Sequence, residues 1–449
     1  MKKIFQYIML AVVTIVMASC TSDIEETTAT TGKNNVQLVV GEFPAFGDSQ
    51  TRAIGTPDEG KTSWAVGDEL LLEIDNTSYG RHNATFTYNG KSWELTSGEL
   101  VYLEGDPAYI SHVYYAPNYK WSNTSLMLKK GKAAGTDEYI EGKARITGNG
   151  KTITVSFAEA TRKYSRLRIA TLPNEQITVD TEYFTPAGSS DMEQNGNYTL
   201  TSDEKGNAYL YGTFENNSEV TVKYREAALT TYTFSQATES AKSYALDATV
   251  ISANSAEEIK SAIEQKVADG KTTIRLNLAP NAGTDEFMAI REAIKGAAPN
   301  DEGTIELTII GVETIPEEAF KRMSQLKSVK MPNVKEIKKY AFSECRYLTV
   351  VEAPSLNKLN SGAFNECYLL SKLTFGPINY ADARYWPIFE DITPNIDLIL
   401  SDYQKEMIET DDDLYTANND IDYALSNKHL NKNFLGREFK SITCRYRVE

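Results

Sequence analysis

The sequence contains few of the side chains on which enzyme chemistry depends. Its 449 residues include three histidines and four cysteines, and none of the histidines (His82, His112 and His429) lies within metal-ligand spacing of another histidine or of a cysteine. Neither a Walker A phosphate loop nor a Gly-x-Ser-x-Gly nucleophile motif occurs. Paired carboxylates of the glycosidase kind can be distant in sequence, but nothing distinguishes one pair. We therefore predict that the protein is not an enzyme and has no catalytic residue, no metal site and no cofactor.

Basic surface and long apolar segments are also scarce. The formal net charge is −16, and no stretch gathers lysine and arginine into a basic stripe, so nucleic acid is not an expected partner. After the N-terminal region, no apolar run approaches the roughly 20 residues that a membrane-spanning helix needs. The four cysteines do not form a disulfide framework. A chain of this length is sufficient for two or three domains.

The N-terminus resembles a lipoprotein signal. A short basic start is followed by the apolar run Ile8–Met17 and then by Ala-Ser-Cys, ending at Cys20, an order typical of a secretory signal. Met-Ala-Ser-Cys is similar to a bacterial lipobox, with Met17 where leucine is usual. The resemblance implies a signal peptide over residues 1–20 and lipid attachment at Cys20. An ordinary cleaved signal with an incidental cysteine is the alternative.

The polar stretch after Cys20 predicts a flexible tether over residues 21–35. Asp23, Glu25 and Glu26 follow closely behind the cysteine and resemble the surface-export signal of Bacteroidetes lipoproteins. We therefore expect an outer-membrane lipoprotein that is held by its lipid anchor and exposed on the cell surface.

Residues 36–248 predict an all-β half. Short β-branched or aromatic runs, among them Val36–Val40 and Ala208–Phe214, are separated by turn signals. Many short strands without helical periodicity indicate β-sandwiches. Because the stretch is long for a single sandwich, a break at the glycines near residue 150 predicts two of them, over 36–150 and 151–248.

Three short motifs in this half resemble the fimbrillin family of Bacteroidetes. They are Thr-Arg-Ala around Arg52, Trp-Ala-Val-Gly-Asp from Trp64 to Asp68, and Val-Tyr-Tyr-Ala-Pro over Val113–Pro117, where Ala116 separates the tyrosines from the proline. The resemblance implies two tandem transthyretin-like β-sandwiches. It also implies protease processing after Arg52, which would remove the first strand and leave its place to a strand of a neighbouring subunit.

From residue 249 the pattern becomes α/β. Ser255-Ala-Glu-Glu258 matches a capping box, and apolar residues follow at helical spacing until Asp269-Gly270. A strand, a second helix and another strand are expected next. Residues 249–304 therefore predict a helix-strand cap that covers one end of the domain that follows.

Three stretches of the chain align in register, 22 residues apart. Equivalent apolar positions are Phe320, Phe342 and Phe364; Leu326, Leu348 and Leu370; Val329, Val351 and Leu373; and Ile315, Ile337 and Leu359. Such a period predicts a solenoid, because each unit is too small to bury its own apolar face. The motif resembles the BspA-like leucine-rich repeats of bacterial surface proteins. We place an α/β leucine-rich-repeat solenoid at 305–376 and a C-terminal cap at 377–449.

Cys345 and Cys367 occupy equivalent positions in neighbouring repeats. Their side chains would enter the core about one strand spacing, 4.8 Å, apart, where a disulfide is geometrically possible. The favoured interpretation is two small buried side chains that remain free thiols.

The strand face of the solenoid is the candidate ligand-binding surface. If Leu307, Val329, Val351 and Leu373 point inward, alternation turns their neighbours outward. This predicts two outward columns: Glu306, Ser328, Val350 and Lys372; and Thr308, Lys330, Glu352 and Thr374. The alternative is a plain solvated face whose opposite charges pair across strands.

These features favour a surface adhesin or a pilus-associated subunit in a tip or accessory position. Its expected partners are a host or bacterial surface protein or glycan and other fimbrillin-type subunits. The alternative is a capture protein for glycans or nutrients, for which clustered exposed tryptophan would be the signal. The four tryptophans, Trp64, Trp93, Trp121 and Trp386, are scattered instead.

Overall fold

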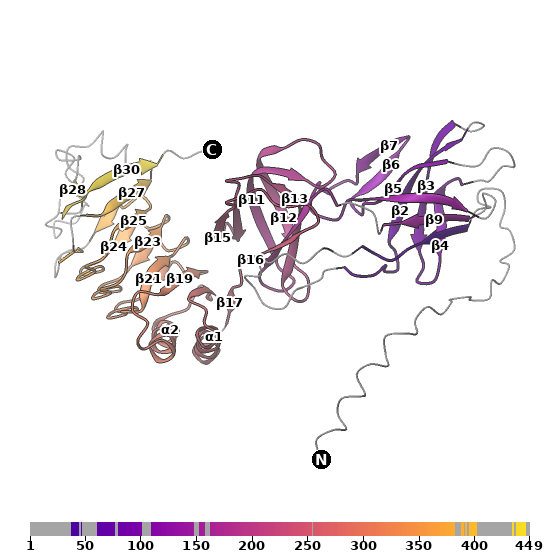
Figure 1. The fold of residues 1–449 in the computed structure, drawn as a ribbon. Helices are drawn as coiled ribbons and strands as arrows, with labels where there is room; N and C mark the ends of the chain where they lie inside the picture. The colour runs from indigo at the N-terminus through magenta and orange to yellow at the C-terminus, as the bar shows by residue number, and fades with distance from the viewer. Residues whose placement is uncertain are drawn as a thin grey trace, which may run out of the picture.

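The computed structural model describes residues 37–44, 46, 61–76, 80–100, 109–147, 152–157, 162–253, 255–381, 388–389, 391–392, 395–401, 433–434 and 437–445. The chain is mostly β-structure and forms three parts that follow one another in space, an N-terminal sheet, a middle sheet and a ladder of repeats (Figure 1). Cys20 and Arg52 lie outside the described residues. No helix in the described ranges is long and apolar enough to cross a membrane.

The N-terminal sheet has seven strands in the order β1-β9-β8-β5-β2-β3-β4. Their bounds are β1 (Gln37–Val40), β2 (Glu69–Asn76), β3 (Gly80–Tyr88), β4 (Trp93–Gly98), β5 (Tyr109–Tyr115), β8 (Ile140–Thr147) and β9 (Thr152–Ser156). A hairpin of β6 (Tyr119–Ser122) and β7 (Ser125–Leu128) stands apart as a two-stranded sheet. β1 is an edge strand and pairs with β9 in parallel.

The division predicted between residues 150 and 151 does not hold. β9 pairs with both β8 and β1, so that division cuts through one sheet. The middle sheet begins only at β10 (Ser165–Ala170). Its other strands are β11 (Gln176–Pro186), β12 (Glu193–Thr201), β13 (Asn207–Phe214), β14 (Glu219–Tyr224), β15 (Ala227–Thr233) and β16 (Ser243–Asp247). Their order is β15-β14-β11-β13-β10-β16, with β12 on β11.

The Trp-x-x-Gly-Asp segment forms a turn that anchors the N-terminal core, as its residue types predict. Gly67 has φ of 93°, a left-handed conformation that glycine adopts without a steric penalty. The Trp64 ring lies 4.9 Å from Phe43, 5.2 Å from Trp93 and 5.2 Å from Tyr115, centroid to centroid. This aromatic cluster joins the segment after β1 to the rest of the N-terminal sheet.

Two helices precede the repeats, as predicted. They are α1 (Ala256–Ala268) and α2 (Thr284–Ala297), and they alternate with β17 (Ile251–Ser252), β18 (Thr273–Asn277) and β19 (Ile305–Ile310). The Glu258 backbone N–H donates to Ser255 Oγ at 3.3 Å, so Ser255 is the N-cap of α1. Ile259 and Ile263 are buried on one face of this helix. The three strands begin an eight-stranded parallel sheet in the order β17-β18-β19-β21-β23-β25-β27-β30.

The repeats form two parallel ladders, one long and one short. The remaining strands of the long ladder are β21 (Leu326–Lys330), β23 (Val350–Ala353), β25 (Lys372–Phe375), β27 (Asp397–Ser401) and β30 (Ser441–Arg445). The short ladder consists of β20 (Thr314–Ile315), β22 (Glu336–Ile337), β24 (Lys358–Leu359) and β26 (Tyr380–Ala381). A two-residue pair, β28 (Asn433–Phe434) and β29 (Arg437–Glu438), precedes β30. From β21 to β25, pairing keeps the 22-residue register, with Val329 opposite Val351 and Val351 opposite Leu373.

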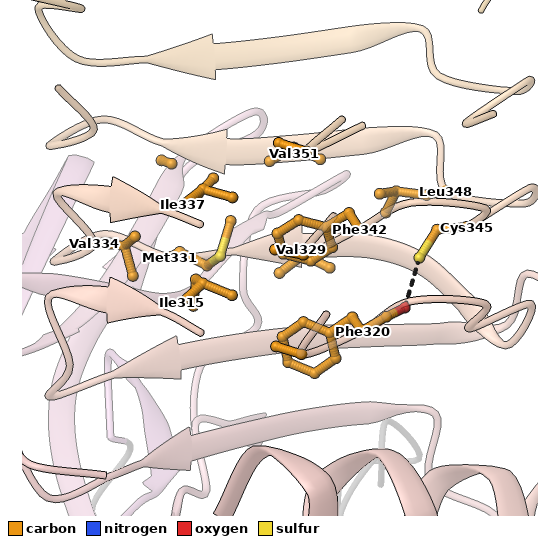
Figure 2. Packing of buried hydrophobic residues seen from close by; sticks show 14 of the residues in the cluster. Ile315, Phe320, Val329, Met331, Val334, Ile337, Phe342, Cys345, Leu348 and Val351 are labelled. Atoms are coloured by element: carbon orange, nitrogen blue, oxygen red, sulfur yellow. Dashed lines mark hydrogen bonds between the residues drawn. The ribbon is translucent and has the colours of Figure 1, made fainter. Parts of the chain in front are cut away.

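Phenylalanine rings stack through the repeat core (Figure 2). Phe320, Phe342 and Phe364 are fully buried. Their ring centroids lie 5.2 Å and then 5.4 Å apart, with interplanar angles of 20° and 5°. The Phe320 N–H donates to the carbonyl of Ala341 in the next repeat, and the Phe342 N–H donates to that of Ala363. Each repeat therefore depends on its neighbour for both packing and backbone hydrogen bonds.

Replacing one ring of this stack should destabilise the whole repeat region. We expect Phe342→Ala to lower the free energy of unfolding by about 3–5 kcal/mol, because a buried ring leaves a cavity against both neighbouring rings. Chemical denaturation of the purified chain measures the effect. Tyr368→Ala is the control, since that ring is 39% exposed. Equal midpoints for Phe342→Ala and the unmodified protein would show that the stack contributes nothing.

Candidate binding surface on the repeat ladder

The long ladder positions the predicted surface residues in the expected register. Glu306, Ser328, Val350 and Lys372 are aligned across four strands, and so are Thr308, Lys330, Glu352 and Thr374. The residues predicted to point inward, Leu307, Val329, Val351 and Leu373, are buried. Six of the eight candidate residues are half-buried or exposed. The two exceptions are Thr308 and Thr374, which are only 4% and 9% exposed, so their prediction as accessible surface residues is wrong.

The middle sheet explains the burial at Thr308. Arg275, the register partner of Thr308 on β18, donates from Nε to the Leu229 carbonyl on β15 at 2.9 Å. Ile310, two residues beyond Thr308, packs into the hydrophobic core of the middle sheet. At Arg275 and Thr308 the outer face of β18 and β19 is therefore covered by another part of the chain, whereas Glu306 on β19 stays partly exposed. Thr374 has a short side chain flanked in register by Glu352 and Ile399.

Charges on the ladder are paired across neighbouring strands. Lys330 Nζ lies 3.3 Å from a Glu352 carboxylate oxygen, and Lys327 Nζ lies 2.8 Å from one of Glu306. The hydrogen bond to Glu306 raises the pKa of Lys327. Both pairs are solvent-exposed, and such pairs contribute about 0–1 kcal/mol each. These are the cross-strand ion pairs of the alternative interpretation, a plain solvated face, and they leave a polar face with compensated charge.

The same pairing recurs beside the ladder at the repeat spacing. Arg322 Nε lies 2.9 Å from a Glu344 carboxylate oxygen, 22 residues on, and this hydrogen bond holds the pKa of Glu344 below its usual value. Lys335 Nζ pairs with Glu313 at 2.6 Å, again over 22 residues. These pairs belong to the repeat architecture, so they do not single out a reaction centre.

The described ranges contain no group of three or more histidine, cysteine, aspartate or glutamate side chains arranged to hold a metal ion. His82 lies on β3 and His112 on β5, where the His112 ring contacts Glu141 at 2.7 Å. His429 lies outside the described residues. The surface described here therefore offers hydrogen bonding and shape, and the prediction that the protein is not an enzyme stays a prediction.

Sequence reasoning missed one residue that limits this surface, Arg275, and one exposed apolar residue in the turn before β25, Leu369. Arg275, at the joint with the middle sheet, looked like an ordinary polar residue of an alternating strand. Leu369 is 52% exposed beside the exposed ring of Tyr368. Its signal was available in the sequence, since an apolar residue occupies a repeat position that the buried pattern does not require.

The two repeat cysteines are free thiols in the core, as favoured. Cys345 Sγ donates to the Phe320 carbonyl at 3.0 Å, and Cys367 Sγ donates to the Phe342 carbonyl at 3.1 Å (Figure 2 shows the first). Burial raises the pKa of Cys345 to about 12. Each thiol thus donates a hydrogen bond to a backbone carbonyl of the preceding repeat.

Comparison with known proteins supports the interpretation of the ladder. Residues 304–385 match the family described as BspA type leucine rich repeat region (6 copies). The C-terminal part therefore contains a leucine-rich-repeat region of the BspA type. None of the curated proteins matches the chain. A solved minor pilin of the gram-positive pathogen Streptococcus agalactiae overlaps 48% of this chain and 94% of its own, with 9% identity and a TM-score of 0.15, too low to support any argument.

The buried thiols should resist modification as long as the protein is folded. At pH 8 only a minute fraction of Cys345 is thiolate, since its pKa is about 12, and alkylation requires the thiolate. We expect iodoacetamide to label Cys345 and Cys367 only in step with unfolding by denaturant, as measured by peptide mass spectrometry. The half-buried Cys444 is the internal comparison. Rapid labelling of Cys345 in the native protein would contradict the burial.

Proposed function

We propose that the protein is a cell-surface binding protein, an adhesin or a pilus-associated subunit in a tip or accessory position. The observation that carries the proposal is the outward face of β21, β23 and β25, where side chains repeat at one strand spacing on a ladder fixed by a continuous core. Such a ladder presents an extended recognition surface. The BspA-type repeat match supports this assignment.

The N-terminal parts would then serve as the support for this surface. We propose that the N-terminal and middle parts are two tandem transthyretin-like β-sandwiches of the fimbrillin kind and that the repeats form an α/β solenoid. Each of the two parts has seven main strands and a hydrophobic core of its own, which supports this division. Lipid attachment at Cys20 would hold the protein in the outer membrane, facing outward.

Capture of glycans or nutrients has less support as an alternative. Trp64 and Trp93 pack against each other in the N-terminal aromatic cluster, and Trp121 contacts Tyr114. Trp386 lies outside the described residues. The described tryptophans thus contact other rings in the N-terminal part and do not line the ladder. Adhesion therefore remains the function that the surface favours.

Altering the outward columns should weaken binding without unfolding the protein. We expect the combined change Ser328→Glu, Lys330→Glu and Lys372→Glu to reduce binding of the purified chain to host cells or neighbouring bacteria roughly tenfold or more, about 1.4 kcal/mol. The control is Lys335→Glu, which breaks the Glu313 pair beside the short ladder. Flow cytometry with the labelled protein measures binding. Equal binding by the triple variant and the control would reject this face as the adhesive surface.

The N-terminus of the natural protein should distinguish a pilus subunit from a free-standing lipoprotein. A pilus subunit is expected to begin after Arg52 and to lose its lipid, whereas a free-standing lipoprotein keeps an acylated Cys20. Mass spectrometry of the protein from native cells and from purified fibres identifies which of these two N-termini is present. An intact, acylated chain within fibres would contradict the processing model, and absence from fibres would reject the pilus role.

A further inference from the structure

The segment after β1 reaches from the N-terminal sheet to the middle sheet. Phe43 packs in the N-terminal core, 4.9 Å from Trp64 and 5.4 Å from Tyr115 between ring centroids. Three residues later, Phe46 lies on the middle part, with its ring 6.2 Å from those of Tyr164 and Tyr211. One short piece of chain thus places an aromatic side chain in each of two domains.

Phe46 covers two arginines of the middle part. The guanidinium carbon of Arg162 lies 3.9 Å from the Phe46 ring centroid, and that of Arg166 lies 4.7 Å away. Both distances are within the roughly 6 Å range of a cation–π contact. The Arg166 Nε also donates to Ser243 Oγ at 3.0 Å, which holds this side chain in place. The guanidinium groups of Arg162 and Arg166 therefore form a binding position for the Phe46 ring, called the seat below.

The contact between the N-terminal and middle sheets, called the joint here, also contains a buried polar cluster. Arg162 donates to Glu138 through two nitrogens, at 3.2 Å and 3.1 Å, and the Tyr164 hydroxyl donates to Glu138 at 2.7 Å. The Arg162 and Glu138 side chains are only 2% and 5% exposed. The Tyr139 N–H donates to the Tyr164 hydroxyl at 3.0 Å, so backbone near β8 is tied to the same group. A buried ion pair of this kind is stable only while water is excluded and its hydrogen bonds are satisfied.

We propose that residues 41–44 and Phe46 act as a strap that locks the N-terminal sheet to the middle sheet. Phe46 shields the Arg162–Glu138 pair from water, and Phe43 and the Trp64 hydrogen bond to the Gly41 carbonyl fix the other end. Loss of the Phe46 contact loosens the joint while each sheet stays folded. One consequence rests on the proposed function: cleavage after Arg52 would release the strap together with the first strand, and the contact between the two sheets would then loosen.

The distance between the two sheets in solution tests the strap. Spin labels are introduced through an unnatural amino acid at the exposed positions Lys91 and Lys205 of the full chain, which leaves the native cysteines unlabelled. Double electron–electron resonance then gives the distance distribution. We expect a narrow distribution for the unmodified chain and a broad one for Phe46→Ala, while Phe46→Tyr stays narrow because it keeps an aromatic face.

The controls separate a loose joint from a damaged fold. Val39→Ala changes an exposed residue of β1 and should leave the distribution narrow. Arg166→Met removes one half of the seat and should broaden it, although the Arg162–Glu138 pair is untouched. Near-UV circular dichroism confirms that each variant is folded. An unchanged distribution in both folded Phe46→Ala and folded Arg166→Met would overturn the strap, whatever the outcome of the binding and processing experiments, because this measurement needs neither ligand nor cleavage.

Discussion

The 22-residue spacing of buried phenylalanines is the constraint on which the repeat region depends. Phe389 continues the stack 5.7 Å from Phe364 although it lies 25 residues further on, so the chain departs from its period and still supplies a ring. At each end the next ring turns edge-on, Phe287 of α2 at 72° and Phe439 at 89°. An edge-on ring offers no parallel face for a further repeat. The edge-on rings of Phe287 and Phe439 therefore end the parallel stack by geometry.

Buried arginines define both joints of the chain, but they are satisfied to different degrees. Arg162 makes two hydrogen bonds to Glu138, whereas Arg275 makes one to the Leu229 carbonyl and has its Nη1 3.7 Å from Asp247. Nη1 of Arg275 is buried without a hydrogen bond. An incompletely satisfied buried cation costs free energy, so the joint to the repeats gains less from its arginine than the joint between the two sheets does.

Periodic features could be predicted from the sequence, and long-range contacts could not. The register of Val329, Val351 and Leu373 follows from spacing alone, because parallel strands of equal repeats must align. The boundary at residue 150 failed because β9 looks the same in sequence whichever sheet it joins, and only its pairing with β1 decides. The prediction that Thr308 is accessible was wrong for a related reason, since no local sequence pattern reveals that a preceding domain covers it.

The compensated charges of the ladder limit how the proposed binding surface would recognise a partner. The chain carries a formal charge of −16, yet Lys327 and Lys330 are matched by Glu306 and Glu352. A matched face produces little long-range field, so it cannot steer a charged partner from a distance. The proposed binding would then depend on close-range shape and hydrogen bonds. Because the middle sheet already covers Arg275 on β18 and Thr308 on β19, the proposed surface would lie mainly on β21, β23 and β25, where the stacked core holds the backbone register.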